Sequence, residues 1–296
     1  MKNFKFQFTL LLLVGLLYSC GSGRKQENDT SYIDEINATN EGSDNKTQSA
    51  NNTENKGSNK KEDNTKENPD GLRGEALRNW LKKQYFDGQH KTLGYKQARR
   101  YMYNFIDNKD GTIEGVYSGY KKQWRYGGRG TNPMPINCEH TVPQSFFDKR
   151  EPMKSDLHHL FPTYADWNRI RSNYGFAEID DQTTTQWMRV KEAKRSIPQK
   201  EEIDEYSEFA DEKFEPRELH KGNLARAVFY FYTMYPDEIE SMSRVANLKT
   251  LYQWHINDPV DDRERKRNEA VAKYQGNRNP YIDKPALIKQ AWPIKE

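Results

Sequence analysis

Ionisable and amide side chains are concentrated in the stretch from residue 137 to residue 173. This stretch contains half of the six histidines of the chain, two acids and two amides: His140, His158, His159, Glu139, Asp156, Asn168 and Asn173. The packing of a hydrophobic core gives little reason to gather such groups. The segment is therefore the candidate site for metal binding or for acid–base chemistry.

The residues around these side chains predict a strand, a second extended segment and a helix. A strand from Pro135 leads into Glu139 and His140, and Pro143 ends it because proline cannot donate to a ladder. The second extended segment is expected over 157–161, with Pro162 ending it. Glu139 and His140 would point to opposite sides of a regular strand, so the strand must bend or end here if both serve one site.

The helix is expected to start at Thr163, whose hydroxyl can cap the first turn together with Asp166 three residues later. Asn168 and Arg171 are three residues apart, so they share one face of this helix. A carboxylate from the strand and an amide oxygen from the helix are ligands that a hard divalent cation prefers, and two such protein ligands suffice for a magnesium-type ion.

The motifs of this segment occur in a specific order. Glu-His-Thr-Val-Pro-Gln-Ser is followed by Met-Lys-Ser-Asp-Leu-His-His-Leu-Phe-Pro and then by Asn-Arg-Ile-Arg-Ser-Asn-Tyr. Further pieces are Gly-Asn-Leu-Ala-Arg-Ala-Val-Phe-Tyr-Phe-Tyr (222–232) and Gln-Gly-Asn-Arg-Asn-Pro (275–280). This series resembles the bacterial endonuclease I family over most of residues 72–296. The resemblance implies an α+β fold, a mixed helical domain built around a ββα-metal (His-Me finger) core, and a sequence-nonspecific nuclease.

The resemblance also implies roles for individual residues. His140 would be the general base, and its ordinary pKa of about 6.5 leaves histidine mostly neutral at pH 7. Glu139 and Asn168 would hold Mg²⁺, or another divalent cation such as Mn²⁺ or Ca²⁺. Arg171 would face the phosphate of the substrate, which would be DNA, with RNA open as a second substrate.

Four further residues are expected to support this site. One of His158 and His159 would be buried and hydrogen-bonded, and the other partly solvated. Asp156 would bond backbone or orient a histidine. Some relatives carry a phosphate-binding arginine between the two motifs, and Arg150 is the candidate for that role in the short connection from 148 to 155.

The front of the chain indicates export. Residues 1–20 combine a basic start with a short apolar run, which is typical of a signal peptide. Cys20 stands where a bacterial lipoprotein signal carries its lipidated cysteine, which predicts a membrane anchor outside the cytoplasm, with simple secretion as the alternative. Residues 21–70 are polar enough to form a disordered tether. Residues 71–296 form the catalytic domain, and we expect it to be a monomer.

Several other segments carry predictions. Helices are expected over 74–86 and over a stripe from Ala98 to Phe105, and Asn223 is expected to cap a central apolar helix. Residues 177–206 show no clear periodicity, and the acidic stretch 201–218 is expected to be a solvated face. The loop Gly119–Gly130 interleaves cations with aromatics, which suits phosphate contact and base stacking or, alternatively, a solvated loop around one buried tryptophan.

Two other functions fit parts of the pattern. A zinc hydrolase could use His140, His158, His159 and Cys138, although the regular spacing of a catalytic zinc motif is absent. An inactive surface lipoprotein that binds nucleic acid is the second alternative, and the intact Glu139, His140 and Asn168 argue against it. The net charge of +3 does not demand a polyanionic partner, so any binding patch must be local.

Overall fold

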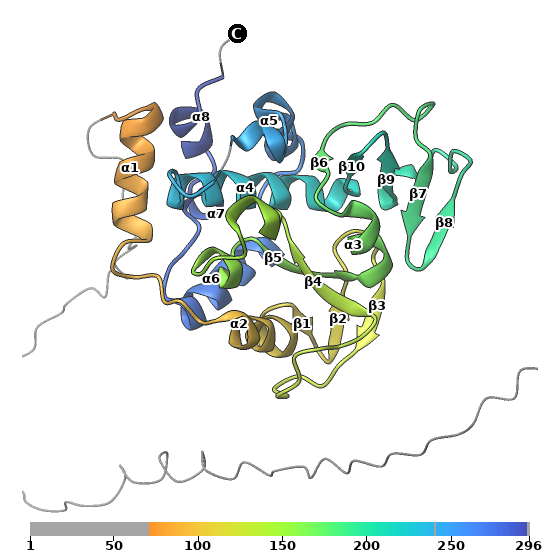
Figure 1. The fold of residues 1–296 in the computed structure, drawn as a ribbon, viewed down its shortest axis with the longest axis horizontal. Coiled ribbons are helices and arrows are strands. Elements are labelled where there is room, and N and C mark those ends of the chain that lie inside the picture. The colour runs from red at the N-terminus through yellow and green to blue at the C-terminus, as the bar shows by residue number, and fades with distance from the viewer. Residues whose placement is uncertain (1–70, 240, 295–296) are drawn as a thin grey trace, which may run out of the picture. The chain divides into compact units, whose positions relative to one another are not determined.

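The structure is a computed structural model that describes residues 71–239 and 241–294. The predicted signal peptide (1–20), the predicted tether (21–70) and the predicted lipidation site Cys20 lie outside the described residues. The described part is a mixed α+β structure with small sheets and short helices around one long helix, which confirms the α+β class (Figure 1). Among its helices, none has the length and apolar character needed to cross a bilayer.

The helices and strands follow one another in a mixed order. The α-helices are α1 (Gly74–Tyr85), α2 (Tyr95–Tyr101), α3 (Ala165–Arg171), α4 (Glu218–Met234), α5 (Leu248–Asn257), α6 (Asp262–Gln275), α7 (Pro280–Asp283) and α8 (Leu287–Ala291). The strands are β1 (Asn108–Lys109), β2 (Thr112–Glu114), β3 (Lys121–Gln123), β4 (Ile136–His140), β5 (Leu160–Tyr164), β6 (Gly175–Phe176), β7 (Gln186–Arg189), β8 (Glu192–Lys194), β9 (Ser207–Ala210) and β10 (Lys213–Glu215). A π-helical turn (Met102–Ile106) continues α2, and 3₁₀ turns lie at Gln144–Phe147, Met153–Ser155, Ile203–Glu205 and Met242–Arg244.

Strands β4 and β5 pair antiparallel, and α3 follows β5 directly. The predicted strand into His140 is confirmed, and it ends at that residue. The predicted end of the second segment at Pro162 is wrong, because Pro162 lies inside β5 opposite Cys138. Proline is tolerated there because a strand in a two-stranded sheet has one edge without a ladder. The helix accordingly begins at Ala165 rather than at Thr163, with no side-chain cap.

Helix α4 is the centre of the helical part, and α1, α5 and α7 pack against it (Figure 1). The predicted central helix is confirmed, but its start at Asn223 is wrong, because α4 begins at Glu218. Gly222 lies inside the helix and serves packing. A Cβ on it would stand 2.0 Å from the carbonyl oxygen of Asp258, so the absence of a side chain lets the segment after α5 approach α4.

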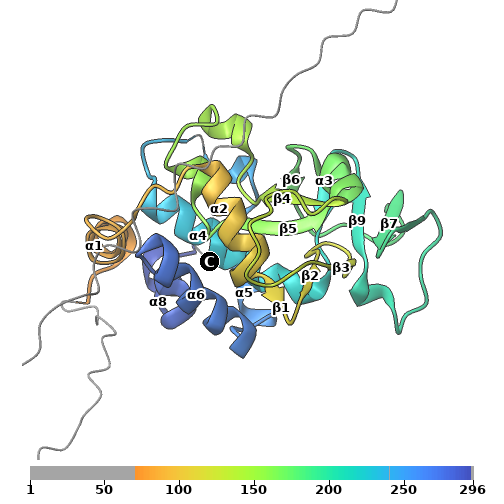
Figure 2. The same ribbon diagram turned by 90° about the horizontal axis from the view of Figure 1, so that it is seen from below.

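Two small sheets flank the β4–β5 pair. Strands β1, β2 and β3 form one sheet, and the other has the order β6-β10-β9-β7-β8. The second sheet contains β7 and β8, which lie within residues 177–206, where the sequence shows no clear periodicity. The acidic stretch is not fully solvated as predicted, since Glu208 and Glu215 are buried on β9 and β10. Lys221 compensates Glu215 with an ion pair of 2.6 Å. From below, α2 lies beside the β4–β5 pair (Figure 2).

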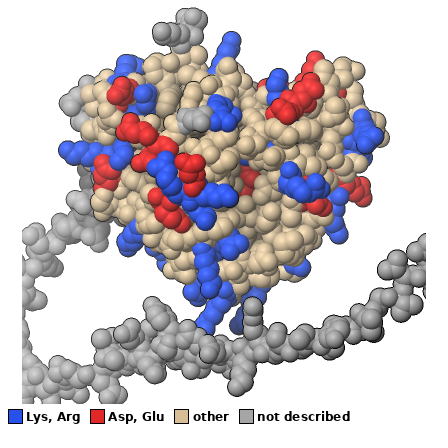
Figure 3. All heavy atoms as spheres, in the orientation of Figure 1, with Lys and Arg blue, Asp and Glu red and all other residues tan. Residues whose placement is uncertain are grey.

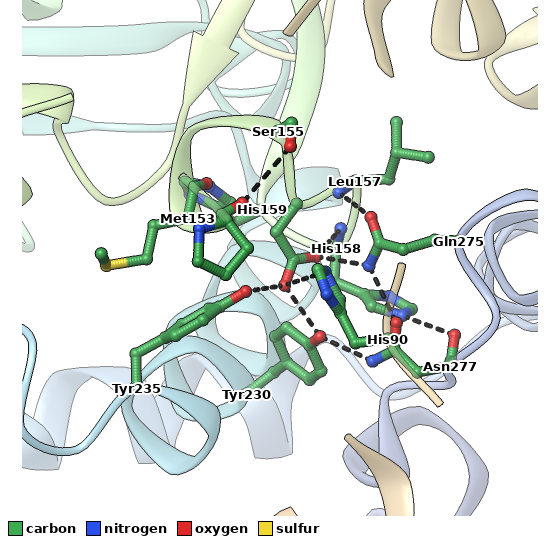
Figure 4. A network of polar contacts seen from close by, with 12 residues as sticks. His90, Met153, Ser155, Leu157, His158, His159, Tyr230, Tyr235, Gln275 and Asn277 are labelled. Atoms are coloured by element: carbon green, nitrogen blue, oxygen red, sulfur yellow. Dashed lines mark hydrogen bonds and ion pairs between the residues drawn. The ribbon is translucent and has the colours of Figure 1, made fainter. Parts of the chain in front are cut away.

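A buried carboxylate joins the loop before β5 to α4 and to the C-terminal segment. Asp156 accepts hydrogen bonds at Oδ2 from Tyr230 (2.9 Å) and Tyr235 (2.8 Å) of the α4 region. Its Oδ1 accepts from the backbone N–H of His158 (2.9 Å) and from Nε2 of Gln275 (2.8 Å). Figure 4 shows Tyr230, Tyr235 and Gln275 of this network pointing toward one another. Burial opposes its charge, yet the histidines around it lower the pKa of Asp156 to about 2.

Asp156→Asn should destabilise the protein on the order of 3 kcal/mol, because four groups donate to the two carboxylate oxygens and an amide keeps only one accepting oxygen. Urea unfolding of the protein measures the effect. Asp237→Asn is the matched control, since Asp237 is exposed and the same charge is removed without a buried partner. Equal unfolding free energies for the two variants would show that the network does not hold these elements together.

Protonation of the buried histidines should destabilise the fold between pH 7 and pH 5. Burial lowers the pKa of all six histidines, and for His158 and His159 it lowers the pKa to about 4. The unfolded chain takes up these protons near pH 6.5 and the folded chain does not, so stability present above pH 6.5 is lost as the pH falls toward 4. His158 and His159 together should lower the unfolding free energy by about 4 kcal/mol between pH 7 and pH 5.

Urea unfolding at pH 7, 6 and 5 checks this dependence. In the variant His159→Gln the unfolding free energy should depend less steeply on pH, because one of the two titrating side chains is absent. The number of protons taken up on unfolding should fall by up to one. A free energy of unfolding that stays constant from pH 7 to pH 5 would contradict the expectation.

Candidate active site

A pocket of about 200 Å³ lies where β4 ends, beside the last turn of α3. Glu139, His140, Asn168 and Arg171 all line it, so the structure brings together the four residues predicted to carry the chemistry. The remaining wall comes mainly from the turn after β4 and the turn after α3, which contributes Asn173. β4 ends at His140, as expected if both Glu139 and His140 serve one site. The two residues are adjacent in the chain and both line the pocket.

The imidazole of His140 has one nitrogen committed to the backbone. Nε2 lies 3.0 Å from the carbonyl oxygen of Lys154, and a carbonyl oxygen can only accept, so Nε2 carries the hydrogen. Nδ1 is therefore the nitrogen with the lone pair in the neutral ring. Burial, with a contribution from nearby His159, holds the pKa of His140 well below its ordinary value. The ring is thus neutral at pH 7 and able to accept a proton at Nδ1.

The carboxylate of Glu139 is buried and held through one of its oxygens. Oε1 accepts a hydrogen bond of 2.7 Å from the hydroxyl of Tyr117 and lies 3.3 Å from Nε of Arg171. Burial raises the pKa of Glu139, and the positive charge of Arg171 opposes that rise. The backbone N–H of His140 also stabilises the charged carboxylate. Oε2 takes part in neither the Tyr117 contact nor the Arg171 contact, so it is the oxygen that can face a cation.

Asn168 turns its amide nitrogen toward β4. Nδ2 donates to Oδ1 of Asn137 (2.9 Å) and to the carbonyl oxygen of Cys138 (3.2 Å). Both hydrogens of the amide are used in this way, so its oxygen points away from β4. Asn168 can therefore contribute an oxygen ligand in the same pocket as Glu139.

Arg171 is almost fully buried, and its nitrogens have partners inside the protein. Nη2 donates to the carbonyl oxygen of Thr141 (2.8 Å) and Nη1 to that of Ser172 (2.9 Å). The guanidinium also lies over the ring of Phe176, 4.4 Å from its centroid. These contacts fix the end of α3 to the end of β4, and the predicted contact with phosphate stays a prediction.

The four residues predicted to support the site lie outside the pocket lining. The ring nitrogens Nε2 of His158 and His159 bond the carbonyl oxygens of Asn277 (3.0 Å) and Met153 (2.7 Å). Both rings are buried, so the expectation that one would be partly solvated is wrong. Asp156 belongs to the network described above. Arg150 forms an ion pair with Glu238 on an exposed part of the surface.

The residues named for a zinc site do not assemble into one. Within 71–239 and 241–294, no group of three or more His, Cys, Asp or Glu side chains could hold a metal ion. Burial raises the pKa of Cys138 to about 12, so its thiol stays protonated and cannot act as a thiolate ligand. The hard oxygens of Glu139 and Asn168 instead suit a magnesium-type ion, which keeps several waters and needs few protein ligands.

Sequence reasoning missed the groups that orient Glu139 and His140. Tyr117 lies 22 residues before Glu139 and follows the β1–β2 hairpin, so no local pattern connects the two residues. The partner of His140 is a backbone carbonyl, which any residue at position 154 would supply. Ser172, at a φ of +52°, makes the sharp turn after α3, and a serine gives no sign of this conformation in a sequence.

Comparison with known proteins matches the chain to one family. The family model described as endonuclease I matches residues 72–286. The chain is 32% identical over 180 residues to an extracellular ribonuclease of Bacillus subtilis (strain 168), covering 55% of this chain and 56% of that protein. It is 29% identical over 165 residues to an extracellular deoxyribonuclease of Aeromonas hydrophila, covering 54% of this chain and 58% of that one.

A periplasmic deoxyribonuclease of the same organism is 27% identical over 162 residues, covering 54% of this chain and 56% of the relative. The chain thus spans little more than half the length of the curated relatives it matches. The family match itself extends from α1 to α7 and includes every residue of the pocket. The resemblance carried by the ordered motifs is confirmed, and the chain belongs to the endonuclease I family.

Proposed function

We propose that this chain is a metal-dependent, sequence-nonspecific endonuclease that hydrolyses phosphodiester bonds of DNA and RNA. One observation carries the proposal: a single pocket holds a neutral histidine with a lone pair on Nδ1 beside a carboxylate and an amide whose oxygens can bind a cation. The unit β4–β5–α3 presents these groups in the order expected of a ββα-metal core. The relatives include a ribonuclease and a deoxyribonuclease, which supports both RNA and DNA as substrates of this chain.

Glu139 and Asn168 would hold a divalent cation, Mg²⁺ or alternatively Mn²⁺ or Ca²⁺. Their donor atoms are a carboxylate oxygen and an amide oxygen, the hard ligands that such ions prefer. A bound cation would shield the charge of the phosphate and assist the leaving oxygen. Tyr117 and Arg171 fix the orientation of the Glu139 carboxylate before any cation binds.

His140 would act as the general base. Its Nδ1 takes a proton from water while the water oxygen bonds to phosphorus and the bond to the leaving oxygen breaks. The carbonyl oxygen of Lys154 holds the hydrogen on Nε2, which keeps the ring in one tautomer and stabilises the imidazolium that forms. The ring of Tyr95 packs 5.3 Å from that of His140 between centroids and limits its rotation.

Arg171 would act through position and charge. It ties Glu139, Thr141 and the end of α3 together, and its positive charge in a buried setting attracts the phosphate toward the pocket. Asp156, His158 and His159 hold the loop between β4 and β5, and Arg150 stays a candidate phosphate contact at its surface.

We further propose that the protein works outside the cytoplasm. The names of its relatives, an extracellular ribonuclease and a periplasmic deoxyribonuclease, support this location. Cys20 would carry a lipid anchor, and residues 21–70 would let residues 71–296 stand off the membrane as a monomer. Such a location suggests a role in nucleotide scavenging or in the clearance of extracellular nucleic acid.

His140→Ala should lower the rate of phosphodiester cleavage by roughly 10²–10⁴-fold, because the general base is lost. Cutting of supercoiled plasmid and of RNA, with Mg²⁺ and with EDTA, measures the effect. His255→Ala is the matched control, since both imidazoles are about equally buried and His255 lies on α5, outside the pocket lining. The assignment of His140 fails if its variant folds and cuts at the rate of the control.

Tyr117→Phe should raise the Mg²⁺ concentration needed for half-maximal activity by about tenfold, because one hydrogen bond that orients Glu139 is removed. A titration of activity with Mg²⁺ measures this change. Tyr281→Phe removes a buried hydroxyl that bonds only Thr233 and Trp292, so its titration should match the unaltered protein. Identical titrations for both variants would leave Tyr117 with no part in the cation site.

A further inference from the structure

Two hollows lie beside α2 and the loop that follows β3. The first, here called the loop pocket, has a volume of about 480 Å³ and is lined in part by Trp124, Arg125, Arg129 and the glycines at 127, 128 and 130. The second, here called the α2 pocket, has about 500 Å³ and is lined in part by Tyr95, Lys96, Arg100 and Arg129. Arg129 lines both, so the two hollows adjoin each other. Each has the size of a ligand site, for which about 300–1,000 Å³ is usual.

The cations of these two pockets have no acidic partners among the described residues. Arginines elsewhere in the described part commonly form ion pairs, as Arg150, Arg189, Arg217, Arg226, Arg267 and Arg278 do. Lys and Arg side chains gather, without Asp or Glu, at the lower end of the molecule in Figure 3, where Figure 1 shows α2. Unpaired positive charge of this kind is complementary to a chain of phosphates.

Trp124 provides a fixed ring in the loop pocket. Its Nε1 donates to Oδ1 of Asn104 (3.0 Å), and Nδ2 of Asn104 donates to the carbonyl oxygens of Arg100 and Gly130 (both 2.7 Å). A Cβ on Gly130 would lie 2.3 Å from the Trp124 ring, so only glycine lets the backbone approach so closely. The amide of Asn104 is fully used and cannot read the edge of a base. The pocket therefore offers stacking without base recognition.

The α2 pocket borders the catalytic histidine. The ring of Tyr95 lines this pocket and also packs against the ring of His140, 5.3 Å away between centroids. The ammonium of Lys154 lies 5.3 Å from the centroid of the same tyrosine ring. A row of cations and aromatic rings thus leads from His140 through the α2 pocket to the loop pocket.

We propose that the loop pocket and the α2 pocket bind an unpaired stretch of the substrate strand next to the cleavage site. One base stacks on Trp124, and Arg100, Arg125 and Arg129 contact the phosphates. In a duplex the bases are stacked and paired with each other, so they cannot enter the loop pocket without opening. The inference rests on the proposed nuclease function and adds a preference for single-stranded nucleic acid.

Binding measured without cleavage tests the proposal. The full chain is titrated, in EDTA, against a fluorescent 12-nucleotide oligothymidine and a 12-base-pair duplex, and anisotropy reports the dissociation constant. Trp124→Leu should weaken binding of the oligothymidine by about 5- to 100-fold, the usual loss for one stacked base, and should leave duplex binding nearly unchanged.

A pair of double variants isolates the charge. Arg125→Ala with Arg129→Ala should weaken binding of the oligothymidine and reduce the slope of its salt dependence by about 1.4, because two phosphate contacts are lost. Lys200→Ala with Lys213→Ala removes the same charge from exposed positions after β8 and on β10, outside the lining of both pockets, and it should change neither quantity. Arg125 and Arg129 are exposed, so their variant keeps the test decisive even if Trp124→Leu does not fold.

The outcomes separate this inference from the nuclease proposal. The single-strand inference is overturned if the arginine double variant binds the oligothymidine as tightly as the lysine control does. It is also overturned if the unaltered chain binds oligothymidine and duplex equally. Selective oligothymidine binding without any cleavage in Mg²⁺ would overturn the nuclease proposal and leave the binding site in place.

Discussion

The buried ion pair between Glu139 and Arg171 is the interaction on which the site depends. Both side chains are almost fully excluded from water, and removing two charges from water is expensive unless each has further partners. Those partners are present: Tyr117 bonds the carboxylate, and two backbone carbonyls accept from the guanidinium. The end of β4 and the end of α3 are thereby held together, and the Glu139 carboxylate has a defined direction.

The buried carboxylates of Asp156 and Glu139 have different properties because their surroundings differ. Asp156 has both oxygens bonded by donors, and its pKa is lowered to about 2, so it is a permanently charged centre of the packing. Glu139 lines the pocket, and burial raises its pKa. A buried carboxylate whose charge is opposed by burial gains most from a nearby cation, so Glu139 suits a metal better than Asp156 does.

The sequence was sufficient to predict which residues of the pocket face one another, and insufficient to predict what orients them. Glu139, His140, Asn168 and Arg171 follow from an ordered motif and from helical spacing, and these depend on local chain geometry. Tyr117 and the carbonyl of Lys154 reach the site through tertiary packing, which no local pattern encodes. The starts of α3 and α4 were misplaced for the same reason, since edge-strand pairing at Pro162 and close packing at Gly222 overrode the local signals.

The distribution of histidines shows why composition alone is a poor guide to the metal. Three histidines within one short segment suggest nitrogen ligands, yet in the fold each Nε2 bonds a backbone carbonyl. A ring held this way has its hydrogen fixed on one nitrogen, and only His140 lies at the pocket wall where the other nitrogen can meet water. The same type of hydrogen bond therefore fixes all three rings, and access to the pocket distinguishes His140, the proposed base, from the other two.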